Sequence, residues 1–324
     1  MRTLAALLAA AALMGTSPPV TESFVEAPGP NGPLKGTMLS PSNAAAPMVL
    51  MIPGSGPTDR DGNNPLGVKA ASLRLIAEGL AAQGIASVRI DKRGLFASAA
   101  AVPDANAVTM EDYATDVHSW VSSIRARTGG KCVWLLGHSE GGLVALTASR
   151  KTAASHAPEG ICGLILIATP RRPFGAVLRG QLHANPANAP LLDQADRAIT
   201  ELEAGRRVDA SGLNPALAPL FRANVQGFLI SAMALDPAKL VVAYRGPVLI
   251  LQGERDIQVS KEDAALLGQA QPKAQLRLLP DTNHVLKVVT SDDRAANLAT
   301  YANPDLPLVP DVVPDIATFI RASR

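Results

Sequence analysis

Aromatic residues are scarce in this sequence: Phe, Trp and Tyr together make up 3% of its 324 residues. A hydrophobic core must therefore be built from Ala, Leu, Val and Ile, and a hydrophobic fraction of 47% makes this feasible. Charge of one sign is also lacking. The formal net charge of +2 argues against a surface for nucleic acid or an anionic membrane, because such surfaces are strongly basic. We expect a globular protein with no nucleic-acid partner.

The apolar run at residues 4–14 is too short for a membrane-spanning helix, which needs about 20 residues. Arg2 precedes it, and small residues and then Pro18-Pro19 follow it. This pattern predicts a signal peptide over residues 1–19, hence a secreted or periplasmic protein with no stable membrane insertion after cleavage. The A-x-A-like cleavage pattern is imperfect, so the cut site stays open. An Ala-rich helix or an uncleaved anchor is the alternative.

Cysteine is also scarce, with only Cys132 and Cys162 present. Two thiols without a nearby pair of histidines do not form a zinc site, so we expect no metal. Export would place both in an oxidising compartment. Each lies near the start of an expected strand, and a disulfide can form if those strands are neighbours. Two buried thiols are equally compatible with the sequence.

Short apolar runs alternate with longer helical patterns along most of the chain. Such alternation predicts an α/β fold, with a mostly parallel sheet and helices on both faces. An N-terminal β-hairpin is predicted from residues 24–26 and 34–39, which flank a turn rich in Pro, Gly and Asn. The expected strands are 48–52, 86–90, 132–136, 163–168, 248–251 and 275–279, and the expected helices are 70–83, 109–128, 141–151 and 261–269.

The interval 171–239 breaks this rhythm because it contains no good strand and is too long and too apolar for a simple connection. Helical patches at 191–205 and 217–235 predict a helical cap inserted between two strands. A decorated crossover without substrate contact is the alternative. Apolar residues of the cap suggest an acyl or alcohol site, namely Leu217, Leu220, Phe221, Phe228, Leu229 and Met233.

A G-x-S-x-G motif at residues 137–141 lies between an apolar strand and an Ala/Leu-rich helix. In this setting the serine sits on a sharp strand-to-helix turn, where flanking glycines avoid collisions with the backbone. The turn places the hydroxyl at the N-terminus of a helix, which favours developing negative charge. Ser139 is therefore the predicted nucleophile.

A serine hydroxyl needs a base and an orienting acid, which in this arrangement follow it in the order acid, then histidine. His284 is the only one of five histidines beyond the expected cap, so it is the predicted base. Asp256 follows the strand at 248–251 and is the predicted acid. Glu254 and Asp281 remain competitors for that role.

Acyl transfer also requires backbone N–H donors for the oxyanion. We expect one from Glu140, directly after the nucleophile. The second should come from Ser55, in the Gly-rich turn after the strand at 48–52, with Gly54 and Gly56 as alternatives. A phosphate cradle is disfavoured there because no Lys-Ser/Thr pair follows the glycines.

Taken together, these motifs resemble secreted α/β-hydrolases of the EstD-like carboxylesterase type, which stand near the serine aminopeptidase family. The resemblance implies an α/β-hydrolase domain over residues 20–324, hydrolysis of short-chain acyl esters, and no cofactor. Two departures are Leu95–Ser98, where the family usually has a second glycine, and Glu140, a position often apolar or neutral. The matching segments are 54–63, 91–94, 137–142, 253–259, 283–287 and 304–310.

We therefore expect a serine carboxylesterase that acts on a small-molecule ester through an acyl-serine intermediate. A serine aminopeptidase, a thioesterase, an acyltransferase and a non-catalytic binding protein on the same scaffold remain alternatives. The acidic residues Asp193, Asp196, Glu201 and Glu203 could anchor a substrate amine, but their helical spacing favours a solvated face. Charged residues at 59–61, with Asp91 and Arg93, are interpreted as loop braces. The oligomeric state stays open.

Overall fold

The computed structural model describes residues 19–43, 45–150 and 160–323. Nearly all of the expected signal peptide therefore lies outside the described residues, as does His156. Among the described residues, no single helix is long and apolar enough to cross a membrane. Only a bent pair of helices, Gln226–Met233 and Pro237–Ala243, reaches the required length and composition jointly.

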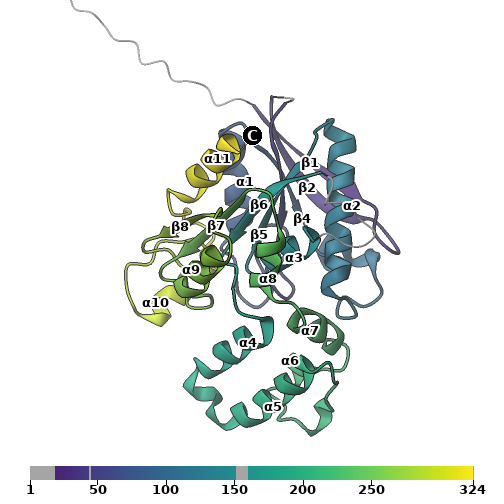
Figure 1. Ribbon diagram of the computed structural model, residues 1–324, viewed down its shortest axis with the longest axis vertical. Coiled ribbons are helices and arrows are strands. Elements are labelled where there is room, and N and C mark those ends of the chain that lie inside the picture. Colours follow the sequence, from purple (N-terminus) through teal and green to yellow (C-terminus); the bar gives the residue numbers. More distant parts are fainter. Residues whose placement is uncertain (1–18, 44, 151–159, 324) are drawn as a thin grey trace, which may run out of the picture.

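A single eight-stranded sheet forms the centre of the protein (Figure 1). Its strand order is β1-β2-β4-β3-β5-β6-β7-β8. Strands β1, β2 and β4 pair antiparallel, and all pairs from β4 to β8 are parallel. The predicted hairpin and mostly parallel sheet are confirmed. The strands are β1 (Val20–Ala27), β2 (Leu34–Pro41), β3 (Met48–Ile52), β4 (Ala86–Ile90), β5 (Val133–His138), β6 (Ile161–Ile167), β7 (Val248–Gly253) and β8 (Gln275–Leu279).

Helices cover both faces of the sheet, which explains why its central strands are apolar throughout. In β3, Val49 and Met51 pack beneath α1 and α11, whereas Leu50 and Ile52 face the core shared with α2, α3, α8 and α9. Helices α1 and α11 thus form one layer and the other four helices the opposite layer. These six helices are α1 (Ser72–Ala82), α2 (Met110–Thr128), α3 (Glu140–Ala148), α8 (Pro237–Ala243), α9 (Lys261–Ala270) and α11 (Val312–Ala322).

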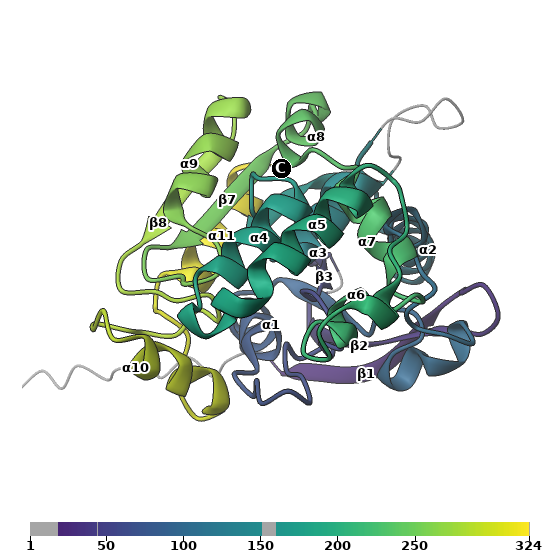
Figure 2. The ribbon, with the colours of Figure 1, turned by 90° about the horizontal axis from the view of Figure 1, so that it is seen from below.

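Four helices between β6 and β7 form a cap with its own hydrophobic cluster. In Figure 1 the cap lies below the sheet, beyond one end of the strands, and Figure 2 views the molecule from the side of the cap. The cap comprises α4 (Phe174–His183), α5 (Leu192–Glu203), α6 (Ala218–Phe221) and α7 (Gln226–Met233). Short 3-10 turns and α10 (Arg294–Ala299) complete the helices of the described chain.

The cap differs from the sequence-based expectation in two respects. Helix α4 was not expected, and the patch at 217–235 is divided between α6 and α7. In addition, the first three residues of α8 fall within the interval assigned to the cap, but this helix packs through Leu240 and Val241 into the core beneath the sheet. The cap therefore ends before α8.

Cys132 and Cys162 form a disulfide, with their Cα atoms 5.1 Å apart. The two residues lie at the amino-terminal ends of β5 and β6, which are neighbours in the sheet. This resolves the pairing that the sequence leaves open. The bridge is at the opposite end of β5 from Ser139.

Candidate active site

Ser139 occupies the turn between β5 and α3. Its backbone angles, φ 55° and ψ −121°, are strained for a residue with a side chain. The Ser139 N–H donates to the carbonyl of Ile167 in β6 at 2.8 Å, which holds the turn against the sheet. The hydroxyl is thereby presented at the carboxyl end of β5 and at the N-terminus of α3, as the motif predicts.

Both glycines of the motif are required by close backbone contacts. A Cβ on Gly137 would lie 2.2 Å from the carbonyl oxygen of Gly141, and a Cβ on Gly141 would lie 2.3 Å from that of Ile52. No side chain fits at these distances. The two glycines therefore let α3 begin immediately beside the ends of β3 and β5.

His284 and Asp256 are brought together by the loops after β8 and β7. The Nδ1–H of His284 donates to Asp256 Oδ2 at 2.7 Å, and both side chains are buried. The two competitors for the acid are paired elsewhere: Glu254 pairs with Lys261, and Asp281 pairs with Arg255. Among the described residues, Ser139 Oγ makes no hydrogen bond, and such nucleophile–base bonds often tighten only in the complex with substrate.

The surroundings of Asp256 keep its carboxylate ionised. Burial alone would raise its pKa, but the charge and hydrogen bond of His284 outweigh burial, and the pKa lies below its ordinary value. Backbone N–H groups of Gln258 and Val259 donate to Oδ1 at 2.8 and 3.0 Å. The carboxylate is thus fixed by several donors and can hold His284 in the tautomer that leaves Nε2 free to accept a proton.

His138 supports the loop that carries His284, a role the sequence did not indicate. Its Nε2 lies 2.8 Å from the backbone oxygen of His284, and the two rings are 4.8 Å apart. Since a carbonyl only accepts hydrogen bonds, Nε2 carries the proton. Burial lowers the pKa of His138 to about 4, so the ring is neutral at pH 7. His138 is therefore a positioning residue and not a base.

The turn after β3 lies directly against the nucleophile. A Cβ on Gly54 would stand 3.5 Å from the Cβ of Ser139, and Ser55 shares a pocket with Ser139. The Ser55 N–H makes no hydrogen bond within the described part of the chain. Ser55 and Glu140 thus flank Ser139 from two different elements, as expected for the two halves of an oxyanion hole.

A buried lysine links the turn after β3 to Glu140. Lys92 Nζ donates to the carbonyl of Gly54 at 2.7 Å and to Glu140 Oε1 at 3.2 Å. Lys92 and Glu140 are each 5% exposed, and Nζ also lies 5.3 Å from the ring of Tyr113. The second carboxylate oxygen of Glu140 has no partner among the described residues. The unusual acidic residue after the nucleophile is therefore the partner of Lys92.

Neighbouring charged residues form the expected braces. Asp91 accepts from the backbone N–H of Arg60 at 2.9 Å and from its guanidinium at 3.1 Å. Arg93 donates to Asp116 on α2 at 2.7 Å, and Asp61 pairs with the buried Arg89. These ion pairs tie the loop after β3 and the loop after β4 to the body of the protein.

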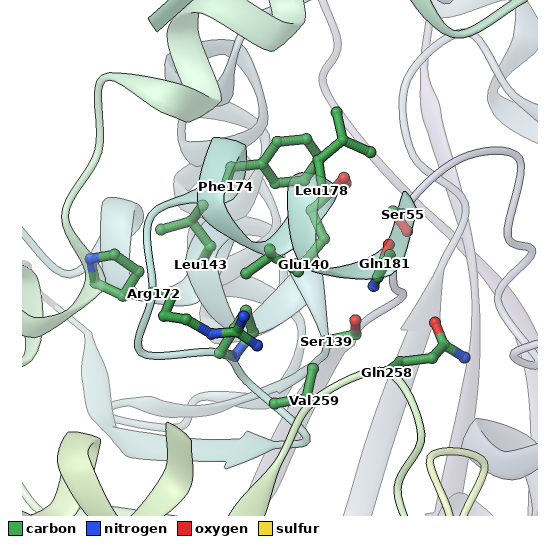
Figure 3. A pocket seen from close by; sticks show the side chains of 13 residues that line it. Ser55, Ser139, Glu140, Leu143, Arg172, Phe174, Leu178, Gln181, Gln258 and Val259 are labelled. Atoms are coloured by element: carbon green, nitrogen blue, oxygen red, sulfur yellow. The ribbon is translucent and has the colours of Figure 1, made fainter. Parts of the chain in front are cut away.

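A pocket of about 70 Å³ opens beside Ser139 (Figure 3). Its apolar wall comes from Phe174, Val177 and Leu178 of α4 and from Leu143 of α3. The polar lining residues are Ser55, Glu140, Arg172, Gln181 and Gln258.

The apolar cap residues named from the sequence are not among those that line this pocket. Phe221, Leu229 and Met233 instead form the internal core of the cap. That prediction was wrong because apolar content does not distinguish a core face from a pocket face. The pocket residues of α4 were missed because Pro173, Gly175 and Gly180 obscure the helical pattern. Arg172, directly before α4, carried no motif signal.

The sheet order, the strained serine between β5 and α3, and the later aspartate–histidine pair define an α/β-hydrolase. The chain belongs to the family described as serine aminopeptidase, S33, whose model matches residues 67–287.

Esterase EstD of Thermotoga maritima is 25% identical to this chain over 273 residues. The match covers 82% of this chain but only 61% of the relative. Est1E from Butyrivibrio proteoclasticus has a TM-score of 0.55 at 16% identity, with 93% of this chain and 98% of that chain covered. An esterase from Thermogutta terrifontis has a TM-score of 0.55 at 19% identity, with 93% and 99% covered. These two structures support the fold.

Proposed function

We propose that this protein is a serine carboxylesterase that hydrolyses esters of short-chain carboxylic acids. The observation that carries the proposal is the hydrogen bond of 2.7 Å between His284 and Asp256. Ser139 in the strained turn between β5 and α3 supplies the matching hydroxyl. Similarity to an esterase over 82% of the chain supports it.

In the proposed reaction, Ser139 Oγ attacks the ester carbonyl carbon while its proton passes to His284 Nε2. The N–H groups of Ser55 and Glu140 donate to the oxyanion of the tetrahedral intermediate. Its collapse breaks the bond to the alcohol oxygen, which takes the proton from His284. Water then attacks the acyl-serine with His284 again as base, and the carboxylic acid and free Ser139 are released.

The dimensions of the pocket favour short acyl chains. Its volume of about 70 Å³ is small beside the roughly 300–1,000 Å³ typical of sites for drug-sized ligands. Phe174 and Leu178 provide an apolar surface for a few methylene groups.

A peptidase acting on free amino termini would need an available carboxylate for the substrate ammonium. Glu140 is the only carboxylate among the residues lining the described pocket, and it is paired with Lys92. The acidic residues Asp193, Asp196, Glu201 and Glu203 of the cap do not line the pocket. Arg179 pairs with Asp196 and Glu203, and Arg206 pairs with Glu201. These contacts favour an ester over an aminopeptidase substrate. A thioester would undergo the same acyl transfer.

The test is hydrolysis of p-nitrophenyl esters from acetate to dodecanoate by wild type and by Ser139→Ala. We expect activity that declines beyond short chains and falls at least about 1,000-fold in the variant. Labelling of Ser139 by a fluorophosphonate probe should accompany it. A folded wild type that neither hydrolyses any of these esters nor reacts with the probe would contradict the proposal.

We further propose that the protein acts in a secreted or periplasmic setting. The disulfide between Cys132 and Cys162 supports this because such bridges persist in oxidising compartments. Fractionation of producing cells should recover the oxidised protein outside the cytoplasm.

A further inference from the structure

Arg172 places a fixed cation in the wall of the Ser139 pocket. The residue lies in the loop between β6 and α4, and it is the only basic side chain among the residues lining that described pocket. Figure 3 shows its guanidinium extending from this loop toward the side of the pocket where Ser139 and Val259 lie. Nothing in the triad or the oxyanion hole requires a cation there.

The guanidinium is held in one position by Asp263 of α9. Arg172 Nε lies 2.9 and 3.0 Å from the two carboxylate oxygens, and Nη2 donates to Oδ2 at 2.7 Å. The Arg172 backbone N–H also donates to Asp263 Oδ1, at 3.2 Å. A side chain anchored in this way loses little further freedom when it binds a ligand.

Asp263 uses only one edge of the guanidinium. The guanidinium of Arg172 has five N–H donors. The Nε–H and one N–H of Nη2 donate to Asp263, and Nη1 has no hydrogen-bond partner among the described residues. Nη1 instead lies near Gly180, where a Cβ would stand 3.1 Å away. The glycine in α4 therefore leaves room beside the free edge of the guanidinium.

The N–H donors of Arg172 left unpaired within the described chain favour an anion at this edge, although Asp263 balances the charge of the guanidinium. Asp263 is 2% exposed and does not line the pocket, so a bound group meets the guanidinium and not the carboxylate behind it. The one lining carboxylate, Glu140, is balanced by Lys92. Elsewhere the wall is apolar or carries neutral amides, as with Gln181 and Gln258.

From this arrangement we propose that Arg172 binds a carboxylate carried by the substrate. The substrate class is an ester with a second, ionised carboxyl group a few bonds from the scissile carbonyl. It is either a hemiester of a short dicarboxylic acid or an acylated short hydroxy acid. This inference rests on the proposed esterase function and specifies the substrate of that same site.

The experiment compares charged esters with neutral isosteres, using pH-stat titration of the acid released. On the acyl arm, methyl hydrogen succinate is compared with methyl levulinate, in which a methyl group replaces the ionised oxygen. On the alcohol arm, acetoxyacetate is compared with acetoxyacetone. Wild type should prefer the charged member of at least one pair in kcat/KM, and the preferred pair identifies the arm that Arg172 contacts.

Arg172→Met should lower the charged-to-neutral ratio of kcat/KM about tenfold or more, because it removes charge-assisted hydrogen bonds. The neutral ester is measured on the same variant, so that the ratio separates loss of the carboxylate contact from any general loss of activity. Arg179→Met is the matched control. Arg179 lies on α4 but pairs with Glu203, and it does not line the pocket. Its replacement should leave the ratio unchanged.

Two further measurements guard against a variant that fails to fold. Arg172→Lys retains the positive charge but not the planar set of N–H donors. This variant should keep part of the preference for the charged ester. The preference of wild type should also weaken as NaCl is raised. The inference is overturned if wild type hydrolyses the neutral esters without preferring either charged ester, or if Arg172→Met leaves the ratio unchanged. Absence of hydrolysis of all four esters, with no fluorophosphonate labelling, overturns the esterase proposal itself and this inference with it.

Discussion

Lys92 and Glu140 form a buried ion pair beside Ser139 in the candidate active site. Removing two charges from water is costly, and the cost is offset only by close pairing and further hydrogen bonds. Lys92 meets this condition through the Gly54 carbonyl and the Glu140 carboxylate. Its ammonium thereby fixes the spacing between the loop carrying the Ser55 N–H and the residue carrying the Glu140 N–H.

Replacing Lys92 by Met should therefore reduce catalysis more than substrate binding. Loss of the tie to Gly54 misplaces one oxyanion donor, and complete removal of such a donor costs about 100- to 1,000-fold in kcat. We expect kcat to fall about tenfold or more, with KM changed less than about threefold. Steady-state kinetics on a p-nitrophenyl ester provides the measurement.

The same variant leaves Glu140 charged and unpaired, which should destabilise the fold by about 3–5 kcal/mol. The double variant Lys92→Met/Glu140→Met also removes the unpaired charge of Glu140 and should recover most of that stability. Its kcat should stay low because the tie to Gly54 is still absent. If kcat recovers together with stability, Lys92 contributes only to folding and does not position the oxyanion hole.

At the level of single residues, the pairing of His284 with Asp256 could be predicted because chain order and loop position left few candidates. His284 was reached by elimination, and Asp256 by its place after a strand. The positioning roles of Lys92 and His138 could not be predicted in the same way. Both depend on contacts between segments far apart in the chain, such as the bond from His138 to the backbone of His284.

At the level of elements, three strands were predicted to the residue. Strands β3, β4 and β8 begin and end at the expected residues, because short apolar runs between helical patterns have few other structures available. Helix α4 shows the opposite case. It tolerates Gly175 and Gly180 because its neighbours occupy the space: the Cβ position of Gly175 is only 2.2 Å from Glu203 of α5. Local propensity alone does not contain that information.

Because α4 forms the apolar wall of the pocket, Leu178→Ala should shift substrate preference toward longer acyl chains. A buried methylene contributes about 0.8 kcal/mol, or roughly fourfold in an equilibrium. We expect the ratio of kcat/KM for p-nitrophenyl octanoate to that for the butanoate to rise about fourfold or more. Comparison of the two esters on purified variants measures this shift.

Leu182→Ala is the matched control for this shift. Leu182 lies on the same helix but packs against the core of the cap and does not line the pocket. The preference should therefore stay at the wild-type value. An equal shift in both variants would mean that loosening of the cap, and not the space vacated by Leu178, sets chain-length preference.

At the level of the whole molecule, the order of the strands determines whether the two cysteines pair, which the sequence leaves open. Cys132 and Cys162 were compatible with a bridge or with two separate thiols, because the sequence does not state which strands are neighbours. In the sheet, β5 stands between β3 and β6, and the two cysteines meet at its amino-terminal end. The same order brings the loops after β3, β5, β7 and β8 together at the carboxyl-terminal end. Structural support and candidate chemistry thus lie at opposite ends of β5.

That separation predicts that the disulfide supports stability without affecting catalysis. The bridged cysteines are 30 residues apart, and closing a loop of this length stabilises a fold by about 3–4 kcal/mol when the unfolded chain is constrained. The double variant Cys132→Ala/Cys162→Ala should lose about that much free energy of unfolding in urea. Wild type kept reduced should lose a similar amount, and it serves as the control for the lost sulfur atoms. For both, kcat on a short p-nitrophenyl ester at 25 °C should stay within about twofold of the oxidised protein, because Ser139 is held by Ile167 and the motif glycines and not by the bridge. A much larger loss of kcat in the folded, reduced protein would show instead that the amino-terminal ends of β5 and β6 control the geometry of the turn that holds Ser139.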